Sequence, residues 1–181
     1  MSQSIISKDA KIDEDVEIGQ FNLIEAGAVI RKGVRLGNFC HIHGDVTIGE
    51  NTIIKDYVEL RKGTVIGTRC EIDSRVSCSG EAVIGDGVTV RYAAIIARGA
   101  KIGDGSYICP RVMMNNLDTE HNSIGGAHIG KNAFIGTNAV LHHGINIGDN
   151  VVVGSMSFVN NDCQSDAVYI GIPANLHKRR N

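Results

Sequence analysis

The sequence contains no tryptophan, only 4% aromatic residues and only two prolines among 181 residues. A core built on large aromatic rings is therefore not expected. No stretch approaches 18 consecutive apolar residues, so we expect no membrane span. The formal net charge is −2, which argues against a nucleic-acid partner. The same low charge, with 43% hydrophobic residues, argues against a disordered chain.

Cysteine pairs are also missing. The five cysteines, an odd number, include no C-x-x-C spacing, which makes a zinc ribbon or a redox pair improbable. The first residues, Met1–Ser4, show no basic start before an apolar run and so no secretory signal. We therefore expect a cytoplasmic protein with reduced thiols.

What the sequence does contain is a repeat of six residues. Starting at Ile6, every sixth residue up to Met114 is apolar. The register then shifts by three residues and resumes at Ile129, continuing to Val159. Additional residues must therefore be inserted between about Asn115 and Ala127. The nineteen apolar positions before the shift are Ile6, Ile12, Ile18, Ile24, Ile30, Leu36, Ile42, Ile48, Ile54, Leu60, Ile66, Ile72, Cys78, Ile84, Val90, Ile96, Ile102, Ile108 and Met114.

Most repeats have a small or β-branched residue two positions before this anchor, and many have glycine directly after it. Two inward residues at i−2 and i are typical of a short strand, whose side chains alternate with period 2. We expect the glycine to permit a sharp bend. Such a unit cannot bury its own apolar edge and must stack on copies of itself, as solenoids do.

The Ile-Gly-x-x-x-x hexads resemble those of the hexapeptide acyltransferases, whose fold is a left-handed β-helix. The resemblance implies three hexads in each triangular coil, and hence about eight coils. We therefore predict an all-β, left-handed parallel β-helix over residues 1–168, with one inserted loop near 115–127 and a short C-terminal tail over 169–181. The resemblance also implies a homotrimer.

The C-terminal half is similar to the sugar and xenobiotic acetyltransferases of this fold. The similar features are Ile102–Gly105 leading to Pro110–Val112, a loop with a histidine, further hexads, and Gly171–Ala174 followed by a basic tail. The resemblance implies transfer of acetyl from acetyl-CoA, as co-substrate, to a hydroxyl or amine of a sugar or sugar-derived acceptor.

His121, in the inserted loop, takes the place of the catalytic histidine of that family. Imidazole titrates near neutral pH, so it can accept the proton of an attacking hydroxyl or amine. Asp118 or Glu120 could orient the ring, and backbone N–H groups near Gly130 or Gly136 could stabilise the oxyanion. Galactoside-type relatives have proline where Asn122 stands, which leaves the acceptor open.

The resemblance places acetyl-CoA along a prism edge between two subunits. The implied donor contacts are Gly136, Thr137, Gly154, Ser155 and Pro173, with Lys178 and Arg179 meeting the CoA phosphates. The candidate acceptor contacts are Arg91, Tyr92, Asn115, Asn116, Asp118 and Glu120. Arg91 hints at an anionic acceptor, whereas the two asparagines suit hydroxyls. No metal ion is expected.

Two alternatives remain open. A γ-carbonic-anhydrase-like metalloenzyme would hold zinc on three histidines across a subunit interface, but His121 and His128 are seven residues apart, unlike the close pair in that family. A non-catalytic β-helix scaffold would not need a polar insertion with a histidine. We expect the histidines at positions 41, 43, 128, 142 and 143 to lie on the surface, where His43, His128 or His143 could line the cleft between subunits.

Overall fold

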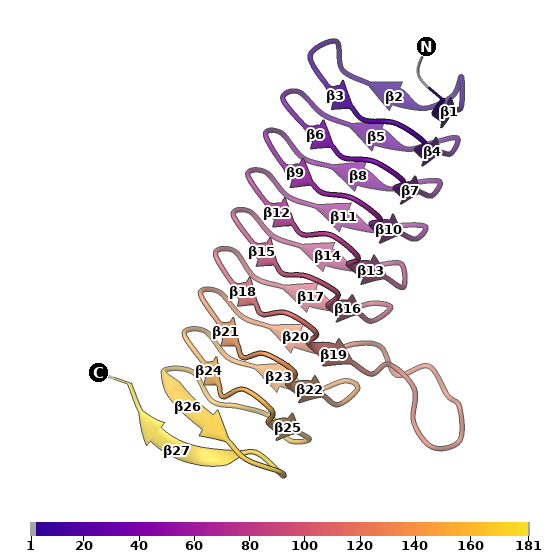
Figure 1. Cartoon of the computed structure of the whole chain (residues 1–181). Helices are drawn as coiled ribbons and strands as arrows, with labels where there is room; N and C mark the ends of the chain where they lie inside the picture. The colour runs from indigo at the N-terminus through magenta and orange to yellow at the C-terminus, as the bar shows by residue number, and fades with distance from the viewer. Residues whose placement is uncertain (1–2, 181) are drawn as a thin grey trace.

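The computed structural model describes residues 3–180, which form strands and turns but no helix. No segment of that range could therefore cross a membrane as a helix. The strands form three sheets around a common axis (Figure 1), and all pairs of strands are parallel except the one between the last two strands.

The strands divide among three sheets, which we name A, B and C. Sheet A contains β1 (Ile5–Ile6), β4 (Leu23–Ile24), β7 (His41–Ile42), β10 (Glu59–Leu60), β13 (Ser77–Cys78), β16 (Ile95–Ile96), β19 (Met113–Met114), β22 (Val140–Leu141) and β25 (Phe158–Val159). Sheet B contains β2 (Lys11–Ile12), β5 (Val29–Ile30), β8 (Thr47–Ile48), β11 (Val65–Ile66), β14 (Val83–Ile84), β17 (Lys101–Ile102), β20 (His128–Ile129) and β23 (Asn146–Ile147). Sheet C contains β3 (Glu17–Ile18), β6 (Arg35–Leu36), β9 (Ile53–Ile54), β12 (Glu71–Ile72), β15 (Thr89–Val90), β18 (Tyr107–Ile108), β21 (Phe134–Ile135), β24 (Val152–Val153), β26 (Ala167–Ile170) and β27 (Asn175–Arg179).

The predicted all-β, left-handed parallel β-helix is confirmed. Strands from successive coils pair in parallel, eighteen residues apart, as in Ile24 with Ile42 and Leu60 with Cys78. The anchor is the second residue of its strand throughout the repeat and is buried from Ile24 onward. Burial of these aliphatic side chains against those of neighbouring coils supplies the apolar core of the stack.

The corners differ from the prediction in one respect. Glycines that follow an anchor do not have a positive φ; a Cβ on Gly49, for example, would lie 2.5 Å from the carbonyl oxygen of Gly67 in the next coil. These glycines are therefore needed for close coil-to-coil contact rather than for the bend. The left-handed backbone falls elsewhere in the corners, often on residues with side chains, such as Phe39 (φ 56°), Tyr57 (φ 59°) and Arg75 (φ 62°).

Eight coils of three strands each, from β1 to β24, match the predicted number, and an irregular ninth follows. In the ninth coil the bridge from Ile147 to Cys163 spans sixteen residues instead of eighteen, so this coil is two residues short. Residues expected to form a separate tail instead pair as β27 antiparallel to β26. Because β26 begins at Ala167, this hairpin crosses the expected boundary at residue 168.

The insertion lies between β19 and β20. Lys101 pairs with His128, twenty-seven residues away, so nine residues are added at a single corner. The loop is bridged across its width between Leu117 and Ser123 and projects from the side of the prism (Figure 1). We call the corner that follows each sheet A strand the A–B corner, and the corner between sheets C and A the C–A corner.

Candidate functional site

The inserted loop is held by its own hydrogen bonds. At its base, the carbonyl oxygen of Asn116 accepts the N–H groups of Ile124 (2.8 Å) and Gly125 (3.1 Å). At its tip, the Asp118 carboxylate accepts the N–H of Glu120 (2.9 Å) and both the backbone N–H (2.8 Å) and the side-chain amide (2.9 Å) of Asn122. The hydrogen bond from the Asn122 side chain is the main cause that holds the pKa of Asp118 below its ordinary value.

His121 sits at the tip of this loop. Its backbone is left-handed (φ 66°), its N–H donates to the carbonyl oxygen of Asp118 (3.2 Å), and its side chain is exposed. We expected Asp118 or Glu120 to orient the ring, but Asp118 caps the loop backbone, and no residue in the described range 3–180 makes a hydrogen bond to the ring. A group that fixes the ring must therefore come from a substrate or another chain.

The loop docks on the A–B corner of the next coil. Gly144 donates its N–H to the carbonyl oxygen of Gly125 (3.0 Å), and a Cβ on Gly144 would lie 2.9 Å from the Ile124 side chain. His142 and His143 occupy that corner, half-buried, with ring centroids 3.9 Å apart. The charge of His143 further lowers the pKa of Asp118.

His142 and His143, expected on the surface, thus lie half-buried at the corner on which the His121 loop docks. Their position in the sequence could have indicated this placement, because they directly follow the first sheet A strand after the insertion. A loop added at one corner must cover the same corner of a neighbouring coil, because the corners stack in register.

The predicted donor contacts gather at the C–A corner of the seventh and eighth coils. A Cβ on Gly136 would lie 2.5 Å from the backbone nitrogen of Ser155, so the two corners are in direct contact. The turn containing Pro173 lies against the same corner, because Ala174 donates its N–H to the Phe158 carbonyl (2.7 Å). Gly136, Thr137, Gly154, Ser155 and Pro173 are thus brought together.

The predicted basic contacts lie elsewhere. Lys178 pairs with Val168 in the terminal hairpin. The Arg179 guanidinium donates to the Gln164 side chain (2.5 Å) and to the Ser165 carbonyl (3.4 Å). These two residues precede β26, whereas the donor corner follows the sheet C strands, so sheet C separates the two positions. Within one chain, Arg179 is therefore separated from Gly136 and Ser155.

The acceptor candidates form two groups. Arg91 and Tyr92 follow β15 and lie on the C–A corner, two coils before Gly136. The Arg91 guanidinium already forms ion pairs with Glu71 (3.3 Å) and Asp73 (3.4 Å), so an anionic acceptor would have to compete with two carboxylates. The other group, Asn115, Asn116, Asp118 and Glu120, belongs to the His121 loop at the A–B corner.

The loop and the donor corner therefore occupy different edges of the triangular prism, with sheet A between them. A single chain does not bring His121 to Gly136. Two chains packed side by side could place the loop of one against the C–A corner of the other, as the resemblance to the family implies.

Cys109 lies on the C–A corner between these groups, hydrogen-bonded to Thr137. It is 6% exposed, and burial raises the pKa of its thiol above the ordinary value. A thiol in this state is a poor nucleophile, so Cys109 is not a candidate catalytic residue.

A shallow groove of about 620 Å³ runs along sheet B near the end of the stack, with Lys101, His128 and Gln164 among its lining residues. Within residues 3–180, the His and carboxylate side chains that converge closely enough to hold a metal ion are Glu25, His41 and His43, several coils from the loop. Neither His121 nor His128 belongs to that group.

Two family models match the chain. The model described as the GMPPB C-terminal domain matches residues 1–97, which is more than half of the chain. The model described as bacterial transferase hexapeptide (six repeats) matches residues 126–161.

Two curated relatives align with part of the chain. The bifunctional protein GlmU of Rhizobium rhizogenes is 37% identical over 76 residues, which is 42% of this chain and 15% of that protein. The galactoside O-acetyltransferase of Escherichia coli is 38% identical over 53 residues, which is 29% of this chain and 26% of that protein. The chain thus spans about a quarter or less of the curated relatives it matches.

Solved structures share the fold more widely. A maltose O-acetyltransferase from Clostridium difficile is 25% identical, with a TM-score of 0.59, over 66% of this chain and 71% of that chain. The Arabidopsis UDP-N-acetylglucosamine acyltransferase is 14% identical, with a TM-score of 0.75, over 98% of this chain and 73% of that chain. The second likeness supports the fold alone.

Proposed function

Because this chain belongs to the hexapeptide-repeat family, with the GMPPB C-terminal domain over residues 1–97, we propose that it is an acetyl-CoA-dependent acetyltransferase. Its acceptor is the hydroxyl or amino group of a sugar or sugar-derived molecule. The galactoside and maltose O-acetyltransferases among its relatives support this substrate class. Its five buried, unpaired cysteines are consistent with the reducing conditions of the cytoplasm.

One observation carries the proposal: a regular stack is interrupted at one corner by nine residues, and these residues present His121. Loops on a rigid scaffold are where catalytic residues concentrate. The loop is tied to the stack through Gly125 and Gly144 and capped by Asp118, so His121 is presented from a defined position.

In the proposed reaction, the neutral His121 imidazole removes the proton from the acceptor O–H or N–H. The acceptor atom attacks the thioester carbonyl carbon, and the resulting oxyanion collapses with cleavage of the C–S bond. CoA leaves as a thiolate and takes the proton from the His121 imidazolium. Transfer is direct, within a complex that contains both substrates.

The sequence leaves open which N–H group near Gly130 or Gly136 stabilises the oxyanion. The N–H groups of Gly130 and Gly136 donate to the carbonyls of Ile147 (2.7 Å) and Val153 (2.9 Å) in the next coil, so neither is free. The backbone N–H of Thr137 interacts with the Cys109 thiol. By contrast, no acceptor for the N–H of Ser155 is present within residues 3–180. We assign the oxyanion contact to the N–H of Ser155 and keep Thr137, which follows the corner glycine Gly136, among the contacts to the thioester.

The test is acetyl-CoA turnover, read as free thiol release with a panel of galactosides, maltose and amino sugars. We expect the His121→Ala variant to lose about 10²–10⁴-fold in kcat, the usual contribution of a general base. His177→Ala, which removes an exposed histidine from β27, is the matched control. Undiminished turnover by His121→Ala would refute the mechanism, and failure of the wild-type protein to bind CoA would refute the proposed function.

A further inference from the structure

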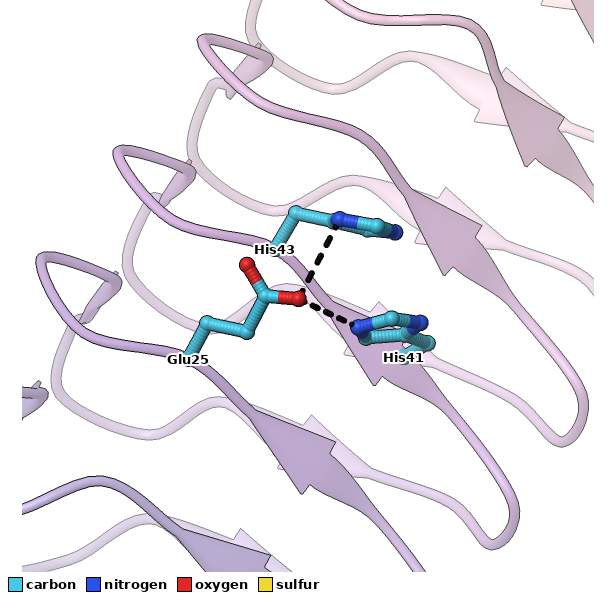
Figure 2. A group of neighbouring side chains, drawn as sticks. All are labelled: Glu25, His41 and His43. Atoms are coloured by element: carbon cyan, nitrogen blue, oxygen red, sulfur yellow. Dashed lines mark hydrogen bonds and ion pairs between the residues drawn. The ribbon is translucent and has the colours of Figure 1, made fainter.

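We propose that Glu25, His41 and His43 form a binding site for a zinc ion on the A–B corner of the second and third coils (Figure 2). One ligand atom from each residue lies within 4.8 Å of the others. Two imidazoles and a carboxylate are a donor set that holds zinc with a position open to water. The inference departs from the expectation that no metal is bound, and it does not depend on the acetyltransferase activity.

The sequence fixes the placement of these residues through the strand register. Ile42 is fully buried, so His41 and His43, its neighbours on either side, both face outward. Glu25 follows β4 in the preceding coil, and the parallel pairing of Ile24 with Ile42 places it beside the two histidines. The three side chains therefore project from paired strands and the residues directly after them, and not from a long loop.

The Glu25 carboxylate is oriented toward the histidines. Its Oε2 accepts the N–H of Gly44 (2.9 Å), which leaves Oε1 facing both rings. Figure 2 shows this oxygen pointing between them, 2.7 Å from His41 Nε2 and 3.3 Å from His43 Nδ1. Both ring nitrogens thus lie next to the same carboxylate oxygen.

The spacing needs only a small adjustment to hold zinc. In a tetrahedral site with bonds of about 2.0–2.1 Å, neighbouring ligand atoms lie about 3.3 Å apart. The Glu25–His43 pair has this separation already, whereas His41 Nε2 would withdraw by about 0.6 Å and give up its direct hydrogen bond. The two rings now stack with centroids 3.7 Å apart and planes 21° apart, so side-chain rotation must also open this angle.

Glu59 completes the arrangement from the fourth coil. His43 Nε2 is buried, makes no well-directed hydrogen bond within the described range, and lies 3.5 Å from Glu59 Oε1. Glu59 is itself held by Arg61 Nε (3.0 Å) and by the Ser77 hydroxyl (3.3 Å). A histidine that ligates a metal usually donates its other N–H to a carboxylate. This assigns Nδ1 of His43 to zinc and gives Glu59 a positioning role.

The experiment titrates zinc into the full-length protein after dialysis against a chelator, by calorimetry, and repeats the titration with cobalt to record its visible absorption. We expect one zinc per chain in the wild-type protein. His41→Ala and Glu25→Gln should lose at least 100-fold in affinity, and Glu59→Gln 10–100-fold at unchanged stoichiometry. A His142→Ala, His143→Ala double variant, which removes the other histidine pair, is the matched control and should bind as the wild type does.

Circular dichroism of each metal-free variant establishes that it is folded, and the nearly isosteric Glu25→Gln tests the site where an alanine variant fails to fold. Absence of zinc binding by the wild type would overturn the proposal. So would binding that survives in Glu25→Gln, or binding that is lost in the His142/His143 double variant instead.

Discussion

At the scale of single residues, Asp118 determines whether His121 has a fixed position. Three hydrogen bonds converge on its carboxylate, and the ionised form accepts them more strongly than the protonated acid would. Because the pKa of Asp118 is held below its ordinary value of 3.8, the charged form stabilises the loop. That contribution is complete above the ordinary pKa and is lost as the pH falls through the lowered pKa of the folded protein.

We therefore expect the amide resonances of Glu120 and Asn122 to titrate together in an NMR pH series, with a midpoint below pH 3.8. Asp118→Ala should remove this transition and lower the turnover that depends on His121. Glu120→Gln, whose side chain takes no part in these hydrogen bonds, should keep the transition. A common midpoint at or above 3.8 would show that the carboxylate does not hold the loop.

At the scale of elements, the stack depends on close backbone contact at its corners. A Cβ on Gly136 would meet the backbone of Gly154 and Ser155, whereas a Cβ on Gly154 would meet the side chain of Ile170 at 2.7 Å. Ile170 is exposed and can move, but the backbone of the next coil is fixed by its own hydrogen bonds.

We predict that Gly136→Ala destabilises the protein by about 1–3 kcal/mol, as overpacking of a rigid core does. Gly154→Ala should cost clearly less, because a flexible side chain can give way. Urea unfolding of both variants, at one protein concentration, measures the difference. Equal or reversed losses would contradict the assignment of this glycine to coil-to-coil contact.

The sequence predicted the strands and their order, but it did not predict the contacts at the corners or those of the inserted loop. The apolar anchors predicted the strands because each must face the axis at a six-residue period. The glycines after the anchors were expected to permit a bend, but they allow close contact between coils. Both roles require a residue without a side chain, so the sequence does not distinguish them. The role of the His142–His143 corner was missed because the docking of Gly125 on Gly144 joins residues on different coils, and no periodic signal marks it.

At the scale of the whole molecule, the two halves of the proposed active site lie on different edges of one chain. We predict that the protein sediments as a trimer, with three times the mass of a single chain, and that each active site uses two chains. The His121 loop of one chain then faces the Thr137–Ser155 corner of its neighbour.

Co-expression can test this arrangement. His121→Ala and a donor-corner variant such as Ser155→Trp should each be inactive alone. If every site is shared, random mixed trimers should recover about one quarter of wild-type activity, because half of the loops and half of the corners are intact. Co-expression of His121→Ala with wild type provides the reference. Mixed trimers without activity would mean that each chain forms its own site.

The corners have a further consequence for engineering. Phe39, Tyr57 and Arg75 hold a left-handed backbone that their side chains disfavour, and this conformation recurs in corner after corner. Each such position keeps a little unrelieved strain, which asparagine or glycine would release. Substitutions at these corners should therefore raise the thermal stability of the protein in small steps, at sites remote from the histidine loop.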